Sequence, residues 1–142
     1  QSGNVIFTSP MNREADLVER IRSAIEKSFG HEVSILLRTV DELEHVIDSN
    51  PFPEEAEKDP KKVHVVFLAD KPERDKVDEI GEAKAKGEDI VSNGRELYLH
   101  LPAGSARTKL NNALFERKLN MPATARNWRT VKILVEMAQQ AQ

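Results

Sequence analysis

The chain has 142 residues with 24 acidic and 21 basic side chains, so it is long enough for one domain and carries a formal net charge of −3. Its 39% hydrophobic and 32% charged residues are typical of a soluble globular protein. The lack of cysteine excludes disulfides and thiol chemistry and favours a cytoplasmic location of the protein. No apolar run approaches the ~20 residues that a membrane span needs.

The first half of the chain alternates strand and helix patterns. Residues 4–7 form a short apolar run that predicts a strand. A helix is expected from Asn12, its N-cap, to Gly30, its C-terminal stop, because apolar side chains recur at intervals of three or four residues. Residues 33–37 then predict a second strand.

The middle of the chain continues this alternation. Thr39 and Glu42 form a capping-box pattern that predicts the start of a second helix. Residues 50–62 hold three prolines and mixed charges, which indicates a surface connection within the domain. The nearly continuous apolar run at 63–69 predicts a central strand, and residues 72–86 predict a charged third helix.

A hairpin and two helices are expected to complete the domain. Strands at residues 88–92 and 95–101 flank Asn-Gly at 93–94, the strongest short hairpin signal, because both residues tolerate positive φ. Helices are predicted roughly over 109–119 and 126–140. The resulting order, β-α-β-α-β-α-β-β-α-α, predicts a single α+β domain over residues 1–142, a sandwich of one mixed sheet with helices packed on it.

Distinctive sequence blocks occur at residues 1–7, 50–52, 87–89, 94–102, 109–110 and 122–131. In this order, and over essentially the whole chain, they resemble the bacterial DUF1697 family of uncharacterised proteins. The resemblance implies an α/β protein with ferredoxin-like halves. No activity is established for that family, so the resemblance assigns no catalytic residue.

Members of this family typically carry several dozen further residues before the block at 1–7, including another strand and helix. The sequence as given begins with that block, so we expect it to lack this segment. A missing strand would leave a sheet edge unpaired, and open edges recruit other chains. A homo-oligomer formed through an exposed sheet edge is therefore one expected partner.

The segment from Gly104 to Lys109 invites comparison with a phosphate-binding loop, because a glycine turn follows a strand and precedes a helix. The second glycine and the Lys-Ser/Thr pair of such loops are missing, so a nucleotide loop is excluded. Two interpretations remain. Ser105 or Thr108 could cap a helix whose free amides form an anion site with Arg107 and Lys109, or the segment is a capped helix start with two solvated cations, which we favour.

The sequence carries no recognisable catalytic or metal-binding constellation. None of the four histidines lies three or four residues from another; they are His31, His45, His64 and His100. Carboxylate pairs fall in charged helices and loops, where they are usually solvated, and no serine lies in a nucleophile motif. We therefore expect neither a metal nor a cofactor, and we assign no catalytic residue.

Positive charge collects at the carboxyl-terminal end. From residue 102 onward, seven basic side chains oppose two acidic ones, a net charge of +5, whereas residues 1–101 carry −8. Arg126, Arg129 and Lys132 recur every third residue of the predicted last helix, beside Trp128, the only tryptophan. This is either a basic edge with a ring for phosphate contact and base stacking, or an amphipathic helix with a core tryptophan. The acidic chain favours the second, so nucleic acid is the less favoured partner.

Arg126 is the first-choice contact residue. An arginine at a helix N-terminus opposes the helix dipole unless a carboxylate, an acidic neighbour or a bound anion lies close. Asn127 beside it could instead bond nearby backbone as part of a cap formed with Thr124. The sequence predicts a binding or interaction module whose anion or partner site comprises Arg107, Lys109, Arg126, Asn127, Trp128 and Arg129. The alternative is an enzyme on a small phosphorylated or carboxylated substrate whose site is completed by the preceding segment.

Overall fold

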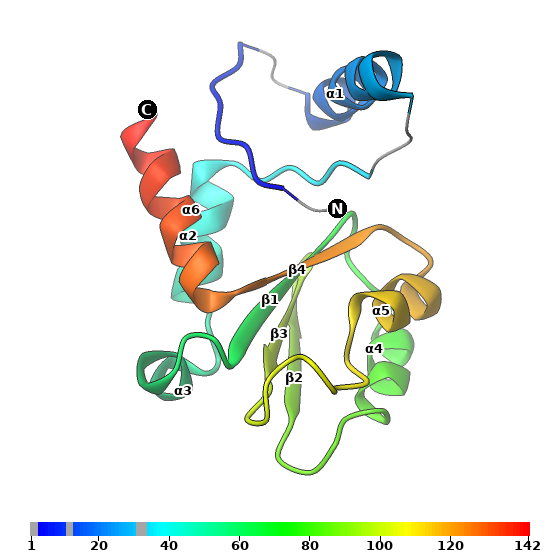
Figure 1. Ribbon diagram of the computed structural model, residues 1–142, viewed down its shortest axis with the longest axis vertical. Coiled ribbons are helices and arrows are strands. Elements are labelled where there is room, and N and C mark those ends of the chain that lie inside the picture. Colours follow the sequence, from blue (N-terminus) through cyan, green and yellow to red (C-terminus); the bar gives the residue numbers. More distant parts are fainter. Residues whose placement is uncertain (1–2, 11–12, 31–33) are drawn as a thin grey trace.

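The computed structural model describes residues 3–10, 13–30 and 34–142, and in these residues it shows six helices and one four-stranded sheet (Figure 1). In chain order the elements are α1 (Glu14–Phe29), α2 (Val40–Asp48), α3 (Pro53–Lys58), β1 (Val63–Leu68), α4 (Arg74–Gly81), β2 (Asp89–Asn93), β3 (Glu96–His100), α5 (Asn112–Leu119), β4 (Ala123–Asn127) and α6 (Trp128–Gln140). No helix among these residues is long and apolar enough to cross a membrane.

The sheet has the order β2-β3-β1-β4, and every neighbouring pair is antiparallel. The central strand β1 sets the register, with Val65 opposite Tyr98 on β3 and opposite Arg126 on β4. The connectivity β1-α4-β2-β3-α5-β4 is a split β-α-β arrangement. The α+β class with helices packed on the sheet is confirmed, although the sheet is antiparallel throughout where a mixed one was expected.

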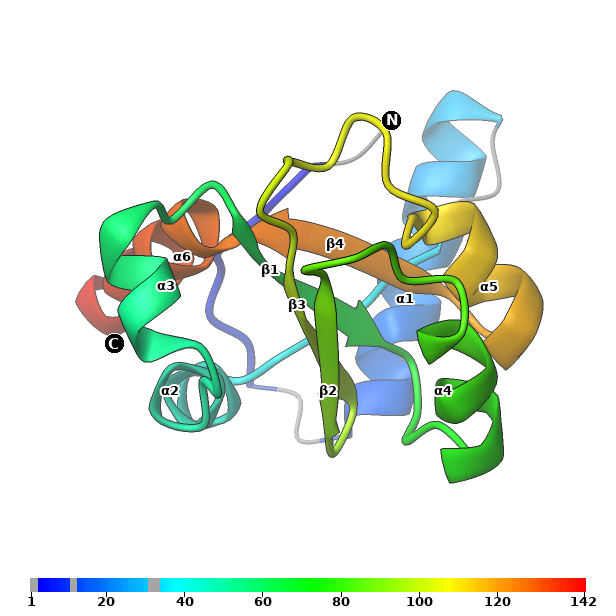
Figure 2. The same cartoon turned by 90° about the horizontal axis from the view of Figure 1, so that it is seen from below.

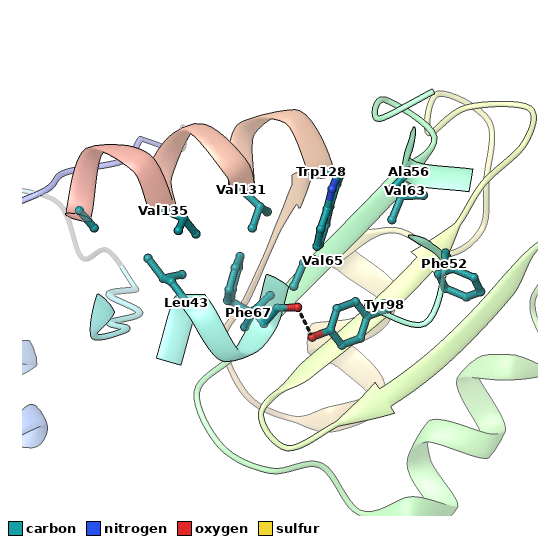
Figure 3. Packing of buried hydrophobic residues seen from close by; sticks show 12 residues of the cluster. Leu43, Phe52, Ala56, Val63, Val65, Phe67, Tyr98, Trp128, Val131 and Val135 are labelled. Carbon is teal, nitrogen blue, oxygen red and sulfur yellow. Dashed lines mark hydrogen bonds between the residues drawn. The ribbon is translucent and has the colours of Figure 1, made fainter. Parts of the chain in front are cut away.

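Helices cover both faces of the sheet (Figure 2). α4 and α5 lie on one face, and α2, α3 and α6 lie on the other. The α2/α6 face holds a core cluster around Val65, Tyr98 and Trp128, and Tyr98 donates a hydrogen bond of 2.8 Å to the carbonyl oxygen of Val46 (Figure 3). The α4/α5 face holds a second, mostly aliphatic cluster around Leu99 and Phe115. Strict alternation along β1 divides its side chains between these two cores.

The strands expected at residues 4–7 and 33–37 do not form in the described residues, which include 4–7 and 34–37. Ile6 and Leu36 from these two segments pack against the α2/α6 core cluster without strand pairing, whereas Val5 and Phe7 are exposed. The expected cap Asn12 and the start of the second segment at Val33 lie outside the described residues. Gly30 ends α1 as predicted, in the left-handed conformation with φ 71°.

Arg38 connects the extended segment before α2 to the sheet. Its guanidinium donates to Glu96 at 2.8 Å and to the carbonyl oxygens of Leu68 and Arg95 at 2.8 and 3.1 Å, and it lies 5.4 Å from the ring centre of Phe67. The side chains of Arg38 and Glu96 are only 6% and 10% exposed. This buried ion pair therefore fixes a segment that has no strand partner.

In the middle of the chain, the predicted capping box and hairpin turn are confirmed, whereas the predictions for residues 50–62 and for the third helix are not. The capping box of Thr39 and Glu42 and the 93–94 hairpin turn are both present. The connection at 50–62 was expected to lie on the surface, but it contains α3 and buries Phe52 and Ala56. The third helix is shorter than expected, because α4 ends at Gly81 and residues 82–87 form turns.

The last predicted helix begins two residues later than expected. Residues 123–127 form β4 instead, which makes β4 and β2 the edge strands of the sheet. Arg126 is therefore a strand residue, and the helix dipole argument does not apply to it. The change arises because β4 gains backbone hydrogen bonds from β1 that no local pattern encodes. Self-association through an edge strand stays a prediction.

Candidate functional site

A pocket of about 390 Å³ lies at the end of the sheet where β1 begins and where β3 and β4 finish. Its apolar lining comes from the α4/α5 face: Leu99, Leu101, Leu110, Phe115 and Ala125. Its polar lining comes from the loop before α5, from β1 and β4, and from the first turns of α5 and α6. A volume of this size accommodates a small organic molecule.

Two helices begin at this pocket. Asn111 caps α5 by accepting a hydrogen bond of 3.0 Å from the amide of Leu114, and Asn127 caps α6 in the same way through Thr130. Both cap residues, together with Asn112 and Thr130, line the pocket. Helix N-termini carry partial positive charge, so this arrangement favours a negatively charged group.

The charge of the lining agrees with that preference. Among the described residues that line the pocket, none is acidic, and Arg126 is the only one with a permanent charge. Ser105 adds a hydroxyl group from the loop that also carries the exposed residues Arg107 and Lys109. The lining therefore provides hydrogen-bond donors for an anion and no carboxylate to repel one.

His64 on β1 is the buried polar residue of the pocket. It is 9% exposed, it shares the α4/α5 face with its register partners Leu99 and Asn127, and its Nδ1 has no hydrogen-bond partner in the described part of the chain. Burial lowers the pKa of His64, since the charged ring loses its hydration. A buried polar atom without a partner is uncommon and calls for an explanation.

Within the described part of the chain, the hydrogen-bond acceptors of Arg126 are all neutral oxygens. Its guanidinium donates to Thr124 at 2.6 Å, to the carbonyl oxygen of Ala125 at 2.9 Å, to Asn4 at 2.9 Å and to the carbonyl oxygen of Gly3 at 3.4 Å. The side chain is half-buried, and desolvation lowers its pKa. None of the ion pairs found among the described residues includes Arg126. By strand alternation its side chain lies on the face opposite His64, at the open edge of the sheet.

The structure brings only two of the six predicted site residues to the pocket, Arg126 and Asn127. Trp128 is 7% exposed and belongs to the α2/α6 core cluster, as its interpretation as a core residue predicted. Arg107, Lys109 and Arg129 are exposed on segments adjoining the pocket and do not line it. Asn127 is a helix cap, the architectural role considered for it beside Thr124.

The loop before α5 does not form the helix start predicted at Lys109. Thr108 accepts a hydrogen bond from the amide of Leu110 at 3.0 Å, and α5 begins three residues later, after Asn111. The helix start that was considered for an anion site at Ser105 or Thr108 therefore lies at Asn112 instead, and both Ser105 and Asn112 line the pocket. Asn is preferred to Thr as an N-cap residue, and Asn111 fills that role here.

Sequence reasoning missed His64 as a site residue, since it considered the histidines only as metal ligands or solvated groups. Among the described residues, no three His, Asp or Glu side chains lie close enough together to share a metal ion. One signal was available: His64 is the only polar residue in the apolar run 63–69. A polar side chain within a buried strand needs a partner or a function.

Replacing His64 by phenylalanine is expected to flatten the acid side of the stability profile. The folded-state pKa lies below the unfolded value of ~6.5, so the unfolded chain binds the proton more readily. Stability is therefore retained above the unfolded pKa and declines as the pH falls through that value toward the folded pKa. Urea unfolding over a pH series measures this slope. His45→Gln, at an exposed site on α2, should keep it, and an unchanged slope in His64→Phe would contradict the assignment.

Comparison with protein families gives a match over residues 1–98 to a family described as "Protein of unknown function (DUF1697)". The matched region contains β1 with His64, β2 and the first part of β3, and it ends before α5, β4 and α6. Comparisons with curated proteins and with solved structures give no match. The family match covers more than half of this chain, so the chain belongs to the DUF1697 family.

Proposed function

We propose that this protein is a cytoplasmic binding or interaction module that holds an anionic group of its ligand or partner at the basic carboxyl-terminal end. The observation that carries the proposal is Arg126, a half-buried arginine whose hydrogen-bond acceptors are all neutral. A desolvated cation without a counter-charge is unfavourable, and a bound anion would supply the missing charge. The carboxylate or anion predicted beside Arg126 is thus met by a ligand rather than by this chain.

The surroundings of Arg126 support an anion. Among the described residues that line the same pocket as Arg126, none is acidic, and the first turns of α5 and α6 contribute to this lining. The exposed cations Arg107, Lys109 and Arg129 lie on segments next to it. Attraction between these cations and a charged ligand raises the association rate and weakens with added salt.

Replacing Arg126 by glutamine is expected to reduce the affinity for inorganic pyrophosphate at least tenfold. Two charge-assisted hydrogen bonds are lost, and each contributes on the order of 1.5–3 kcal/mol. Titration monitored by the fluorescence of Trp128, the only tryptophan, measures the affinity at two salt concentrations. Arg74→Gln makes the same charge change at the exposed start of α4 and should leave the affinity unchanged. Equal affinity in both variants would refute a role for Arg126.

One observation favours a second candidate, an enzyme acting on a small phosphorylated or carboxylated substrate. His64 is a neutral imidazole beside a pocket, which is the form that accepts a proton in general base catalysis. Binding and catalysis differ in one readout. An enzyme converts its ligand, and His64→Phe would abolish conversion, whereas a binding module returns the ligand unchanged.

A further inference from the structure

The sheet has two edge strands, and the outer edge of β4 already meets partners from its own chain. The carbonyl oxygen of Pro122 accepts from the amide that follows β1, so alternation along β4 turns the backbone groups of Ala123 and Ala125 away from β1. The amide of Ala123 donates to the carboxylate of Glu116 at 3.3 Å. The carbonyl oxygen of Ala125 accepts from Arg126 at 2.9 Å. Side chains of this chain therefore occupy β4 at both outward positions.

The orientation of the other edge strand, β2, follows from its pairing with β3. The amide of Leu101 donates to the carbonyl oxygen of Lys62 at 2.8 Å, which turns every second residue of β3 toward β1 and leaves Tyr98 facing β2. The register pairs Tyr98 with Val91, so the backbone groups of Val91 face β3. The residues on either side of Val91 therefore turn their backbone groups away from the sheet.

The outward polar groups of β2 are the amides and carbonyl oxygens of Ile90 and Ser92. Among the described residues, none of these groups has a hydrogen-bond partner. Every residue of β2 except Ile90 is exposed, and Figure 2 shows the strand in front of the other strands, with α2 to its left and α4 to its right. Free backbone groups on an exposed edge are a template for pairing with another strand.

The sequence of β2 is complementary to itself. Antiparallel pairing of two β2 strands about a twofold axis at Val91 places this residue opposite its own copy. Ile90 then lies opposite Ser92 on both sides of the axis, so outward groups meet outward groups and each such pair exchanges two hydrogen bonds. The only charged residue of the strand, Asp89, lies opposite Asn93. This register therefore opposes no like charges.

Val91 adds an apolar contact at the axis. Its side chain is 40% exposed, although its register partner Tyr98 belongs to the α2/α6 core cluster on the same face of the sheet. In this register the two copies of Val91 form a non-hydrogen-bonded pair, the kind in which side chains approach most closely. Each valine would cover the other and extend the core of its own copy across the axis.

We propose that β2 is a self-association edge, at which two copies of this chain pair their β2 strands antiparallel about Val91 and join their sheets into one. A strand of unrelated sequence would match the free backbone groups but not this arrangement of side chains, so the partner is a second copy. The interface is small, and the association is therefore weak and reversible. It is separate from the anion site, because Arg126 lies on the opposite edge strand.

Sedimentation equilibrium on the full chain, at concentrations up to about 1 mM, tests the association in the range of weak interfaces. The average mass should rise from monomer toward dimer. Val91→Lys places like charges opposite each other at the axis and should remove this rise. Ile133→Lys makes the same change at a side chain that is 45% exposed on α6, and it should associate as the unchanged chain does. Circular dichroism checks that both variants fold.

Single cysteines test the register, since the chain has no cysteine of its own. Val91→Cys places two thiols opposite each other across the axis, within the Cα separation that a disulfide spans. Ser92→Cys places them on a diagonal, beyond the ~7 Å limit for such a bridge. Under mild oxidation Val91→Cys should form the linked dimer at least tenfold faster than Ser92→Cys. Cysteine is close to valine in size, so this test stands even if Val91→Lys fails to fold.

Each contrary result overturns a stated part of the proposal. A chain that stays monomeric over the whole range would refute self-association. Association that persists in Val91→Lys would place the contact away from β2, and equal rates of linkage in the two cysteine variants would refute the register. Pyrophosphate binding should be the same in all of these variants, so a failure of this proposal leaves the proposed function untouched.

Discussion

Arg38→Ala is expected to lower the free energy of unfolding by ~3–5 kcal/mol, the cost of leaving a buried charge without its partner. The guanidinium is 6% exposed and bonds Glu96 at 2.8 Å, so its removal leaves a carboxylate that is only 10% exposed. The carbonyl oxygens of Leu68 and Arg95 lose a donor at the same time. Urea unfolding followed by circular dichroism measures the change.

The expected loss depends on the unpaired partner rather than on the charge removed. Arg38→Met combined with Glu96→Leu should therefore recover most of the stability, because apolar replacements of buried pairs are often neutral. Arg74→Ala removes an exposed arginine at the start of α4 and should change the free energy of unfolding by less than ~0.5 kcal/mol. A loss in Arg38→Ala no larger than in Arg74→Ala would show that the ion pair does not hold the segment before α2.

The features that the sequence predicts well are those whose energetics are local. The capping box at Thr39 and Glu42 joins residues three apart, and the turn at 93–94 needs only two residues that tolerate its backbone angles. Each such structure is stabilised by its own neighbours. Their recognition therefore does not depend on knowing the rest of the fold.

Pairing between distant segments explains the main errors. Residues 123–127 have weak strand propensity and become β4 because β1 offers hydrogen bonds along its whole length. Residues 4–7 have a stronger strand composition, yet no neighbouring strand in the described residues pairs with them. Strand composition measures how well side chains suit a sheet, and it does not show which backbone lies alongside.

In the candidate site, too, some residues could be predicted from the sequence and others depend on contacts between distant segments. Arg126 and Asn127 could be selected from the sequence, because charge and capping residues are visible there. That His64 lines a pocket with Asn112 and Phe115 depends on α5, which lies some fifty residues away along the chain. A pocket formed at the ends of three strands and two helices becomes apparent only when the fold assembles them.

Trp128→Ala is expected to lower the free energy of unfolding by ~3–5 kcal/mol, as for other large aromatic side chains removed from a core. Trp128 is 7% exposed and packs with Val65 and Val131 between α6 and the sheet (Figure 3). The cavity left behind cannot close fully, because β1 and α6 are each fixed by other contacts. Urea unfolding measured by circular dichroism reports the change, since the fluorescent side chain is itself removed.

The same substitution decides between the two interpretations of the tryptophan. A ring used for stacking on a ligand would be dispensable for folding, and its loss would weaken binding at nearly full stability. A core ring predicts the opposite result. Trp128→Phe should keep more stability than Trp128→Ala, and both variants should bind inorganic pyrophosphate normally while folded. Arg129→Ala, next in sequence but exposed, should change stability by less than ~0.5 kcal/mol. The burial of Trp128 assigns its ring to the α2/α6 core cluster, and these two measurements test whether the ring also contributes to binding.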